Sequence, residues 1–226
     1  MIGTLANDKA ERNAVFIDFG GVLTTSLFDA FKEFGAAIGP DPKLPMRVLA
    51  EDPAAAALLV EHEEGRMDDE AFEAGFAERL AAHGAPTEAE GLIARIQSGL
   101  KPDPKMVALV EDLRRDGRPV ALVSNSLGRD CYAGFDLDQM FDAVVISAAV
   151  GIRKPSKGIY EIACEKLGVS PDEAIMIDDL KHNLEGAQRL GIAGILHTDA
   201  ETTRHSLRDL LRPLAAAQTE ELNNAV

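Results

Sequence analysis

The chain has 226 residues, 46% hydrophobic and 27% charged, and its 23 basic against 38 acidic residues give a formal net charge of −15. This composition excludes a collagen-like or wholly disordered chain. The acidic excess argues against nucleic acid and anionic membranes as partners, because both repel a polyanion at long range. It does not exclude a small phosphorylated ligand, since a local cation reverses the charge of a single pocket.

The sequence lacks the usual signals of export. Two cysteines, Cys131 and Cys164, are too few for a disulfide framework or a zinc site. The first residues show no basic start followed by an apolar run, as a secretory signal would. No apolar run approaches the ~18 residues that a membrane-spanning helix requires. We therefore expect a cytoplasmic protein with reduced thiols.

Short apolar runs rich in β-branched residues alternate with amphipathic stretches along much of the chain. The apolar runs predict buried strands at 14–17, 119–123, 143–146, 174–177 and 192–196. The amphipathic stretches predict helices at 104–116, 156–167 and 180–190, each followed by a glycine. This alternation predicts an α/β fold, a Rossmann-like doubly wound parallel sheet with both faces covered.

Residues 25–100 follow a different pattern, because apolar residues recur there at helical spacing and no buried-strand run interrupts them. Phe72, Phe76 and Leu80 form one such stripe. Prolines and glycines divide the stretch into four or five helices. We predict an all-helical cap at 25–100 inserted into a core of residues 1–24 and 101–213, the alternative being extra helices packed directly on the sheet. Residues 214–226 lack a pattern and are expected to fray.

Polar side chains follow the predicted strands where each one ends, and the carboxyl ends of parallel strands are where ligands bind. Carboxylates that meet there repel one another unless a cation intervenes, and hard oxygen ligands suit Mg²⁺. A hydroxyl and a lysine beside such a cation complete a cradle for a phosphoryl group. The residues concerned are Asp18, Ser124, Asn125, Lys154, Asp178 and Asp179.

These residues resemble the four motifs of the haloacid dehalogenase superfamily, in order and in spacing. The motifs correspond to Asp18 to Thr24 (DFGGVLT), Ser124 to Ser126, Lys154-Pro155, and Asp178 to Asn183 (DDLKHN). Within the superfamily, DFGGVL, EEGRMDDEAF and IDDLKHNLEGAQRLGI are similar to the phosphatase half of mammalian soluble epoxide hydrolase and to bacterial sugar-1-phosphate phosphatases. The resemblance implies a core with a helical cap after the first strand.

The resemblance also implies a role for each motif residue. Asp18 would be the nucleophile, which forms an aspartyl-phosphate intermediate. Ser124, Asn125 and Lys154 would bind the phosphoryl group. Mg²⁺ would be held by Asp18, the main-chain carbonyl of Gly20 and Asp179, with Asp178 acting through water or behind the direct ligands and Asn183 orienting them. The implied function is a Mg²⁺-dependent phosphatase-like hydrolase acting on a small phosphorylated metabolite.

One position departs from the pattern of the superfamily. Most of its phosphatases carry a second aspartate, a general acid, two residues after the nucleophile, where this chain has Gly20. General acid catalysis contributes about 10²- to 10⁴-fold. The loss predicts a preference for sugar-1-phosphates or acyl phosphates, whose leaving oxygens are less basic. His62, His83 and His182 are alternative proton sources.

Two other functions remain open. A 2-haloacid dehalogenase fits Gly20, because halide leaves without an acid, but it needs no metal and leaves the Asp178-Asp179 pair unexplained. A catalytically silent binding module also fits Gly20, but has no chemical need for Asp18, Ser124, Lys154 and Asp179 together. The sequence determines neither the substrate nor the oligomeric state.

Overall fold

A parallel five-stranded sheet forms the centre of the protein in the computed structural model, which describes residues 12–211. The tail predicted to fray, 214–226, lies outside the described residues. The strands lie in the order β3-β2-β1-β4-β5, and all four pairs are parallel. They are β1 (Ala14–Ile17), β2 (Val120–Ser124), β3 (Ala143–Ile146), β4 (Ala174–Asp178) and β5 (Ala193–Leu196).

All five predicted strands are confirmed to within one residue at each end. The three central strands are fully buried, which explains why their sequences read as continuous apolar runs and not as alternating ones. Val15 and Ile17 of β1 belong to one apolar cluster, and Ala14 and Phe16 belong to another on the opposite face. The strands therefore contribute to two cores.

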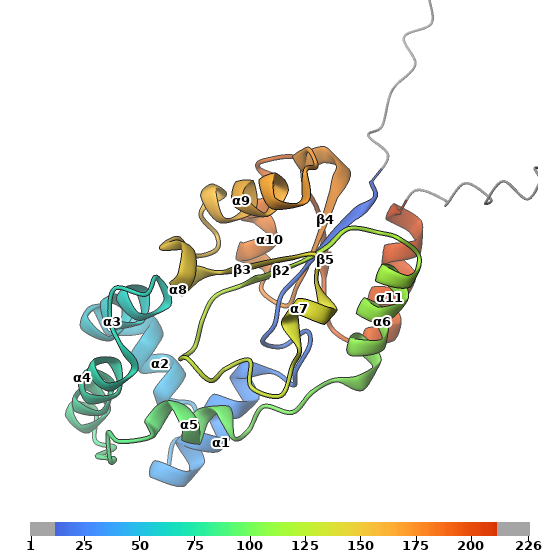
Figure 1. Cartoon of the computed structure of the whole chain (residues 1–226). Helices are drawn as coiled ribbons and strands as arrows, with labels where there is room; N and C mark the ends of the chain where they lie inside the picture. The colour runs from blue at the N-terminus through green and yellow to red at the C-terminus, as the bar shows by residue number, and fades with distance from the viewer. Residues whose placement is uncertain (1–11, 212–226) are drawn as a thin grey trace, which may run out of the picture.

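Helices cover both faces of the sheet (Figure 1), as predicted. The cluster around Phe16 packs on α9 (Lys157–Leu167) and α10 (Lys181–Gln188), and the cluster around Ile17 packs on α6 (Pro104–Arg115) and α11 (Ala200–Leu210). Asp103 begins α6 by accepting hydrogen bonds from two backbone amides of its first turn. Three short elements complete this part: α7 (Leu137–Met140), α8 (Ser147–Val150) and the 3₁₀ helix Pro171–Glu173.

The first five of the six helices between β1 and β2 form a group with its own apolar cluster, centred on Phe72, Phe76 and Leu80. The segments that enter and leave the group lie side by side, since Thr25 N donates to Lys101 O at 2.8 Å. Figure 1 shows the group beside the carboxyl edge of the sheet, with α3 next to α8. The helices are α1 (Leu27–Ile38), α2 (Leu44–Glu51), α3 (Pro53–Glu63), α4 (Asp69–Ala82) and α5 (Leu92–Gln97).

The helical content predicted for 25–100 is confirmed, while the domain boundaries at 25 and 100 stay predictions. Among residues 12–211, no helix combines the length and the apolar character that crossing a membrane requires. The cytoplasmic location also stays a prediction.

Candidate active site

The order of the strands brings three of the predicted site residues together. β1 lies at the centre of the sheet between β2 and β4, and Ile17 pairs with Leu122 on one side and Ile177 on the other. Asp18 directly follows β1, Ser124 is the last residue of β2, and Asp178 is the last residue of β4. Because the strands are parallel and in register, these side chains emerge at the same edge.

Lys154 lies at the middle of this group, although it comes from the longer connection after β3. Its Nζ is 2.7 Å from Asp18 Oδ1 and 2.7 Å from Asp178 Oδ2. Lys154 is 1% exposed and Asp178 is 0% exposed, so this ion pair network is shielded from water. Burial raises the pKa of Asp18 well above its usual range, and the Lys154 ammonium opposes that shift.

Asp18 and Asp178, the two aspartates that pair with Lys154, differ in the number of hydrogen bonds that they accept. Asp178 accepts a hydrogen bond from Leu180 N at 2.8 Å, and both of its carboxylate oxygens lie 3.1 Å from the donor Asn183 Nδ2. Asp18 accepts from Phe19 N at 2.7 Å and from Lys154. Both Asp18 contacts use Oδ1, so among the described residues Oδ2 is the oxygen left for attack or for a ligand.

The acidic cluster fits a divalent cation. One carboxylate oxygen from each of Asp18, Asp178 and Asp179 lies within 4.8 Å of the others. With Lys154 as the only cation in this ion pair network, three carboxylates leave two negative charges uncompensated. Burial, and then the Asp178 charge, raise the pKa of Asp179 to about 6. A hard cation with oxygen ligands, such as Mg²⁺, matches both the charge and the donor type.

A glycine pair after Asp18 shapes the space around this cluster. Gly21 has φ +78°, and a Cβ at that position would overlap the Asp179 carboxylate, so a glycine is required for Asp179 to approach. At Gly20 the space is open, because the nearest atom to an added Cβ is Leu27 Cβ at 3.9 Å. The missing aspartate at position 20 is thus no consequence of crowding at its Cβ.

The side chain of Asn125 is hydrogen-bonded to the main chain of Lys154. Its side chain accepts from Lys154 N at 2.8 Å and donates to Lys154 O at 3.2 Å. This two-point contact fixes the backbone that carries the lysine. The Asn125 side chain therefore holds the Lys154 backbone in place, and the role of Asn125 at the phosphoryl group stays a prediction.

Ser124 has a partner that the sequence did not indicate. Tyr132 lies in the irregular segment after β2, and its hydroxyl donates a hydrogen bond to Ser124 Oγ at 2.9 Å. Its ring meets Phe19 edge to face, with centroids 4.7 Å apart. The segment has no periodic pattern that would have pointed to this tyrosine.

The three histidines named as alternative proton sources have other surroundings. His62 is buried, bonds Asp69 at 2.9 Å and stacks on Phe72. His83 bonds Asp52 at 2.9 Å, and His182 is exposed at the start of α10. The contacts of His62 and His83 are with other residues of the helical group, which accounts for them as structural side chains.

A buried carboxylate from the helical group faces the connection that carries Lys154. Glu63, the last residue of α3, has its Oε2 2.8 Å from Arg153 Nε, and its side chain is 14% exposed. Its main-chain carbonyl also accepts from Ser147 Oγ of α8. Burial raises the pKa of Glu63 to about 7, with the Arg153 and Lys154 charges opposing the shift. The sequence missed Glu63 because it lies in a run of acidic residues that reads as a solvated face.

We expect Glu63→Gln to change the pH dependence of stability. Since the folded pKa lies above the ordinary value of 4.5, the folded state binds more protons than the unfolded state between about pH 4.5 and pH 7. The wild type therefore loses stability as pH rises through this window. The stability of Glu63→Gln relative to wild type should be about 2 kcal/mol greater at pH 8 than at pH 5.5. Urea unfolding at both pH values measures it.

Glu161→Gln is the matched control, because Glu161 is an exposed carboxylate on α9 that pairs with Lys157 at 3.1 Å. Its stability difference from wild type should be the same at both pH values to within about 0.5 kcal/mol. If the stability of Glu63→Gln relative to wild type is also the same at pH 5.5 and pH 8, the raised pKa of Glu63 is contradicted.

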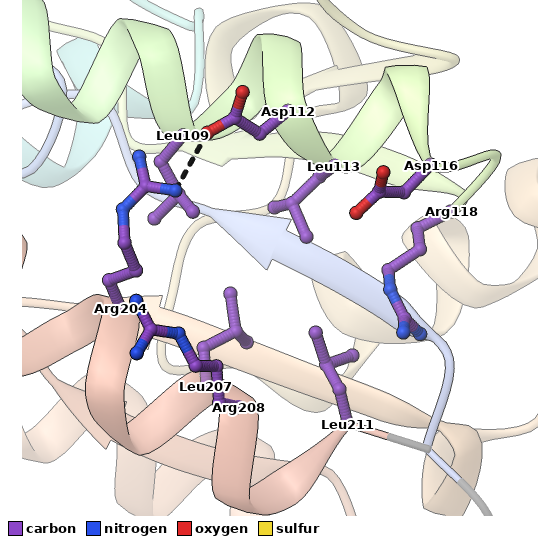
Figure 2. A pocket seen from close by; sticks show the side chains of 9 residues that line it. All are labelled: Leu109, Asp112, Leu113, Asp116, Arg118, Arg204, Leu207, Arg208 and Leu211. Atoms are coloured by element: carbon purple, nitrogen blue, oxygen red, sulfur yellow. Dashed lines mark hydrogen bonds and ion pairs between the residues drawn. The ribbon is translucent and has the colours of Figure 1, made fainter. Parts of the chain in front are cut away.

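A hollow lies between α6 and α11 (Figure 2). Leucines from both helices form its apolar floor, and an ion pair between Arg204 and Asp112 at 2.7 Å crosses its rim. It extends toward the amino ends of the strands, because Arg118 precedes β2 and Leu211 pairs with Arg12, just before β1. It shares no lining residue with the aspartate cluster.

Comparison with known families identifies the class. Residues 13–191 match the model of the haloacid dehalogenase-like hydrolases, which is more than half of the chain. The chain therefore belongs to this family of hydrolases. The family expected from the motifs is confirmed.

The curated relatives include phosphatases and a dehalogenase. The chain is similar to sesquiterpene phosphatase astK of Aspergillus oryzae (31% identity, 50% of this chain, 59% of that protein). It is also similar to bifunctional epoxide hydrolase 2 of Rattus norvegicus (32%, 46% and 20%) and to (S)-2-haloacid dehalogenase 4A of Burkholderia cepacia (31%, 45% and 47%). In each case the match spans less than two thirds of the relative's length.

Solved structures share the fold over most of the chain. A predicted haloacid dehalogenase-like hydrolase from Porphyromonas gingivalis has a TM-score of 0.66 and 24% identity, covering 91% of this chain and 100% of that one. The enzyme bt-2542 of Bacteroides thetaiotaomicron, solved as a magnesium complex, has a TM-score of 0.63 and 22% identity, covering 88% and 99%. Both comparisons establish the fold predicted from the alternating pattern.

Proposed function

We propose that the protein is a Mg²⁺-dependent phosphatase that acts on a small phosphorylated metabolite through an aspartyl-phosphate on Asp18. The observation that carries the proposal is the cluster of Asp18, Asp178 and Asp179, with two uncompensated negative charges. Asp18 and Asp178 are buried and both pair with Lys154, and Asp179 is partly exposed. Asp18, Asp179 and the main-chain carbonyl of Gly20 would hold the metal. When bound, the ion supplies positive charge that stabilises the phosphoryl oxygens.

The side chains around Asp18 have distinct tasks in this reaction. Asp18 Oδ2 attacks phosphorus, a bond from Oδ2 to phosphorus forms, and the bond from phosphorus to the leaving oxygen breaks. Water then attacks the aspartyl-phosphate, which releases inorganic phosphate and restores the carboxylate. Lys154 holds Asp18 in place and offsets the charge of the phosphoryl group, Ser124 donates to one of its oxygens, and Asn183 fixes Asp178.

The open space at Gly20 supports a restricted choice of substrate. No side chain at position 20 can donate a proton to the leaving oxygen, which favours substrates whose leaving oxygen departs as an anion. Anomeric phosphates and acyl phosphates have the less basic leaving oxygens. We infer a preference for these two classes over simple alkyl phosphates.

Dehalogenation is the second candidate, favoured by Gly20 and by the likeness to the haloacid dehalogenase of Burkholderia cepacia. In that reaction Asp18 would attack carbon and halide would leave without a proton. The Asp178 and Asp179 carboxylates oppose this function, since a metal-free reaction gives no reason to hold three carboxylates within 4.8 Å.

Metal removal separates these functions. We expect the purified protein to release phosphate from an anomeric sugar phosphate with Mg²⁺, to lose that activity in EDTA, and to recover it in excess Mg²⁺. Chloride release from 2-chloropropionate that persists in EDTA would instead identify a dehalogenase. If neither product forms and beryllofluoride with Mg²⁺ does not bind, the protein is a silent binding module.

A further inference from the structure

We infer that Tyr132 is a positioning residue that directs the Ser124 hydroxyl toward the phosphoryl group. The inference rests on the proposed phosphatase function and assigns part of its phosphate site to a residue outside the four motifs. Tyr132 lies eight residues after Ser124, in the segment between β2 and α7, and its hydroxyl is 2.9 Å from Ser124 Oγ. This hydrogen bond joins the segment to the end of the strand that carries Ser124.

One aromatic contact holds the Tyr132 ring against Phe19, and a second holds Phe19 itself. The ring meets Phe19 edge to face at 4.7 Å and 65°, and Phe19 meets Phe135 in the same way at 4.9 Å and 75°. Phe19 directly follows Asp18, and its amide donates to Asp18 Oδ1 at 2.7 Å. The tyrosine hydroxyl is therefore positioned by the same residue that orients the nucleophile.

The hydrogen-bonding capacity of a hydroxyl group determines where the Tyr132 and Ser124 protons point. Each hydroxyl has one proton and two acceptor lone pairs. Burial raises the pKa of Tyr132, so the phenol keeps its proton and donates it to Ser124 Oγ. The Ser124 proton must then point elsewhere, and its acceptor in the structure, the carbonyl of Asn125, is distant at 3.3 Å.

A phosphoryl oxygen is a stronger acceptor than that carbonyl. When it arrives, the Ser124 proton can turn to it while Tyr132 continues to occupy a lone pair of Oγ. Hydrogen bonds in such a chain strengthen one another. Without the Tyr132 hydroxyl, Ser124 Oγ would lose its donor, and its own proton would have more orientations to choose from.

The test is Tyr132→Phe, which removes the hydroxyl and keeps the ring against Phe19. We expect the dissociation constant for inorganic phosphate in the presence of Mg²⁺, measured by calorimetry, to rise about 5- to 10-fold, as loss of one hydrogen bond predicts. KM for the best substrate should rise by the same factor with kcat changing less, because Ser124 contacts the phosphoryl group before and during the reaction.

A double-mutant cycle shows whether the effect passes through Ser124. In a Ser124→Ala background, Tyr132→Phe should change phosphate affinity less than 2-fold, since no Oγ remains to be oriented. Phe135→Leu is the matched control, because it disturbs the packing on Phe19 without removing a hydroxyl. Its effect on phosphate affinity should be the same in the wild-type and the Ser124→Ala backgrounds.

The outcomes separate this inference from the proposed function. A wild type that does not bind phosphate overturns both. A wild type that binds phosphate, with a Tyr132→Phe variant that binds it equally well, overturns the role of Tyr132 alone. A Tyr132→Phe effect that persists in full in the Ser124→Ala background also overturns it, because the tyrosine would then act by packing or by its own contact with the ligand.

Discussion

Replacing Gly20 by aspartate should raise turnover of simple alkyl phosphates by about 10²- to 10⁴-fold, the range that a general acid contributes. The increase should be much smaller for acyl phosphates, because their leaving oxygens depart without a proton. The result to measure is therefore the ratio of kcat/KM between the two substrate classes, in wild type and in Gly20→Asp.

The structure accommodates this substitution. Gly20 is not among the glycines with positive φ, and the nearest atom to an added Cβ is Leu27 Cβ at 3.9 Å, an ordinary contact distance. The neighbouring Gly21 differs in both respects, since it has φ +78° and a Cβ there would overlap Asp179. Of the pair, only position 20 can take a side chain without moving the carboxylates.

Gly20→Asn is the matched control, because asparagine has nearly the same shape and cannot transfer a proton. It should leave the ratio between substrate classes at the wild-type value. Gly20→Asp combined with Asp18→Asn should be inactive, which shows that the gain requires the nucleophile. If Gly20→Asp and Gly20→Asn behave alike, the missing acid does not set the choice of substrate.

Most of the fold could be predicted from the sequence because its three central strands are buried on both faces. A run such as AVFI at Ala14–Ile17 has no polar residue to interrupt it, and a polar residue directly follows each of the five strands. The helices between residues 25 and 100 were predictable as a class from their spacing. Their packing was not, because the cluster around Phe72 and Phe76 depends on contacts between separate helices.

The site residues at the ends of strands could be predicted from the sequence. Those that come from the connecting segments could not. Asp18 and Asp178 meet because β1 and β4 are neighbours in register, which follows from a parallel sheet. Tyr132 and Glu63 come from segments whose path depends on packing, so spacing gave no signal for either. The bonds from Asn125 to the backbone of Lys154 also depend on the path of the long connection after β3.

Lys154→Met should destabilise the protein by about 3–5 kcal/mol, the effect of removing one partner from a buried ion pair. Methionine has a similar length and fills the space, so the loss arises from charge and not from a cavity. Asp18 and Asp178 are 7% and 0% exposed, and each would lose a cationic partner at 2.7 Å. Urea unfolding at pH 7.5 in EDTA measures the difference.

The matched control is Lys157→Met, since Lys157 lies three residues along the chain, is exposed and pairs with Glu161 at 3.1 Å. Removing a surface pair changes stability by about 0–1 kcal/mol. A cation that binds the folded state stabilises it according to its concentration and affinity. Added Mg²⁺ should therefore recover more stability in Lys154→Met than in wild type, because it then replaces the only positive charge among three carboxylates. If Lys154→Met loses no more stability than Lys157→Met, the aspartates do not carry the charges that the metal site requires.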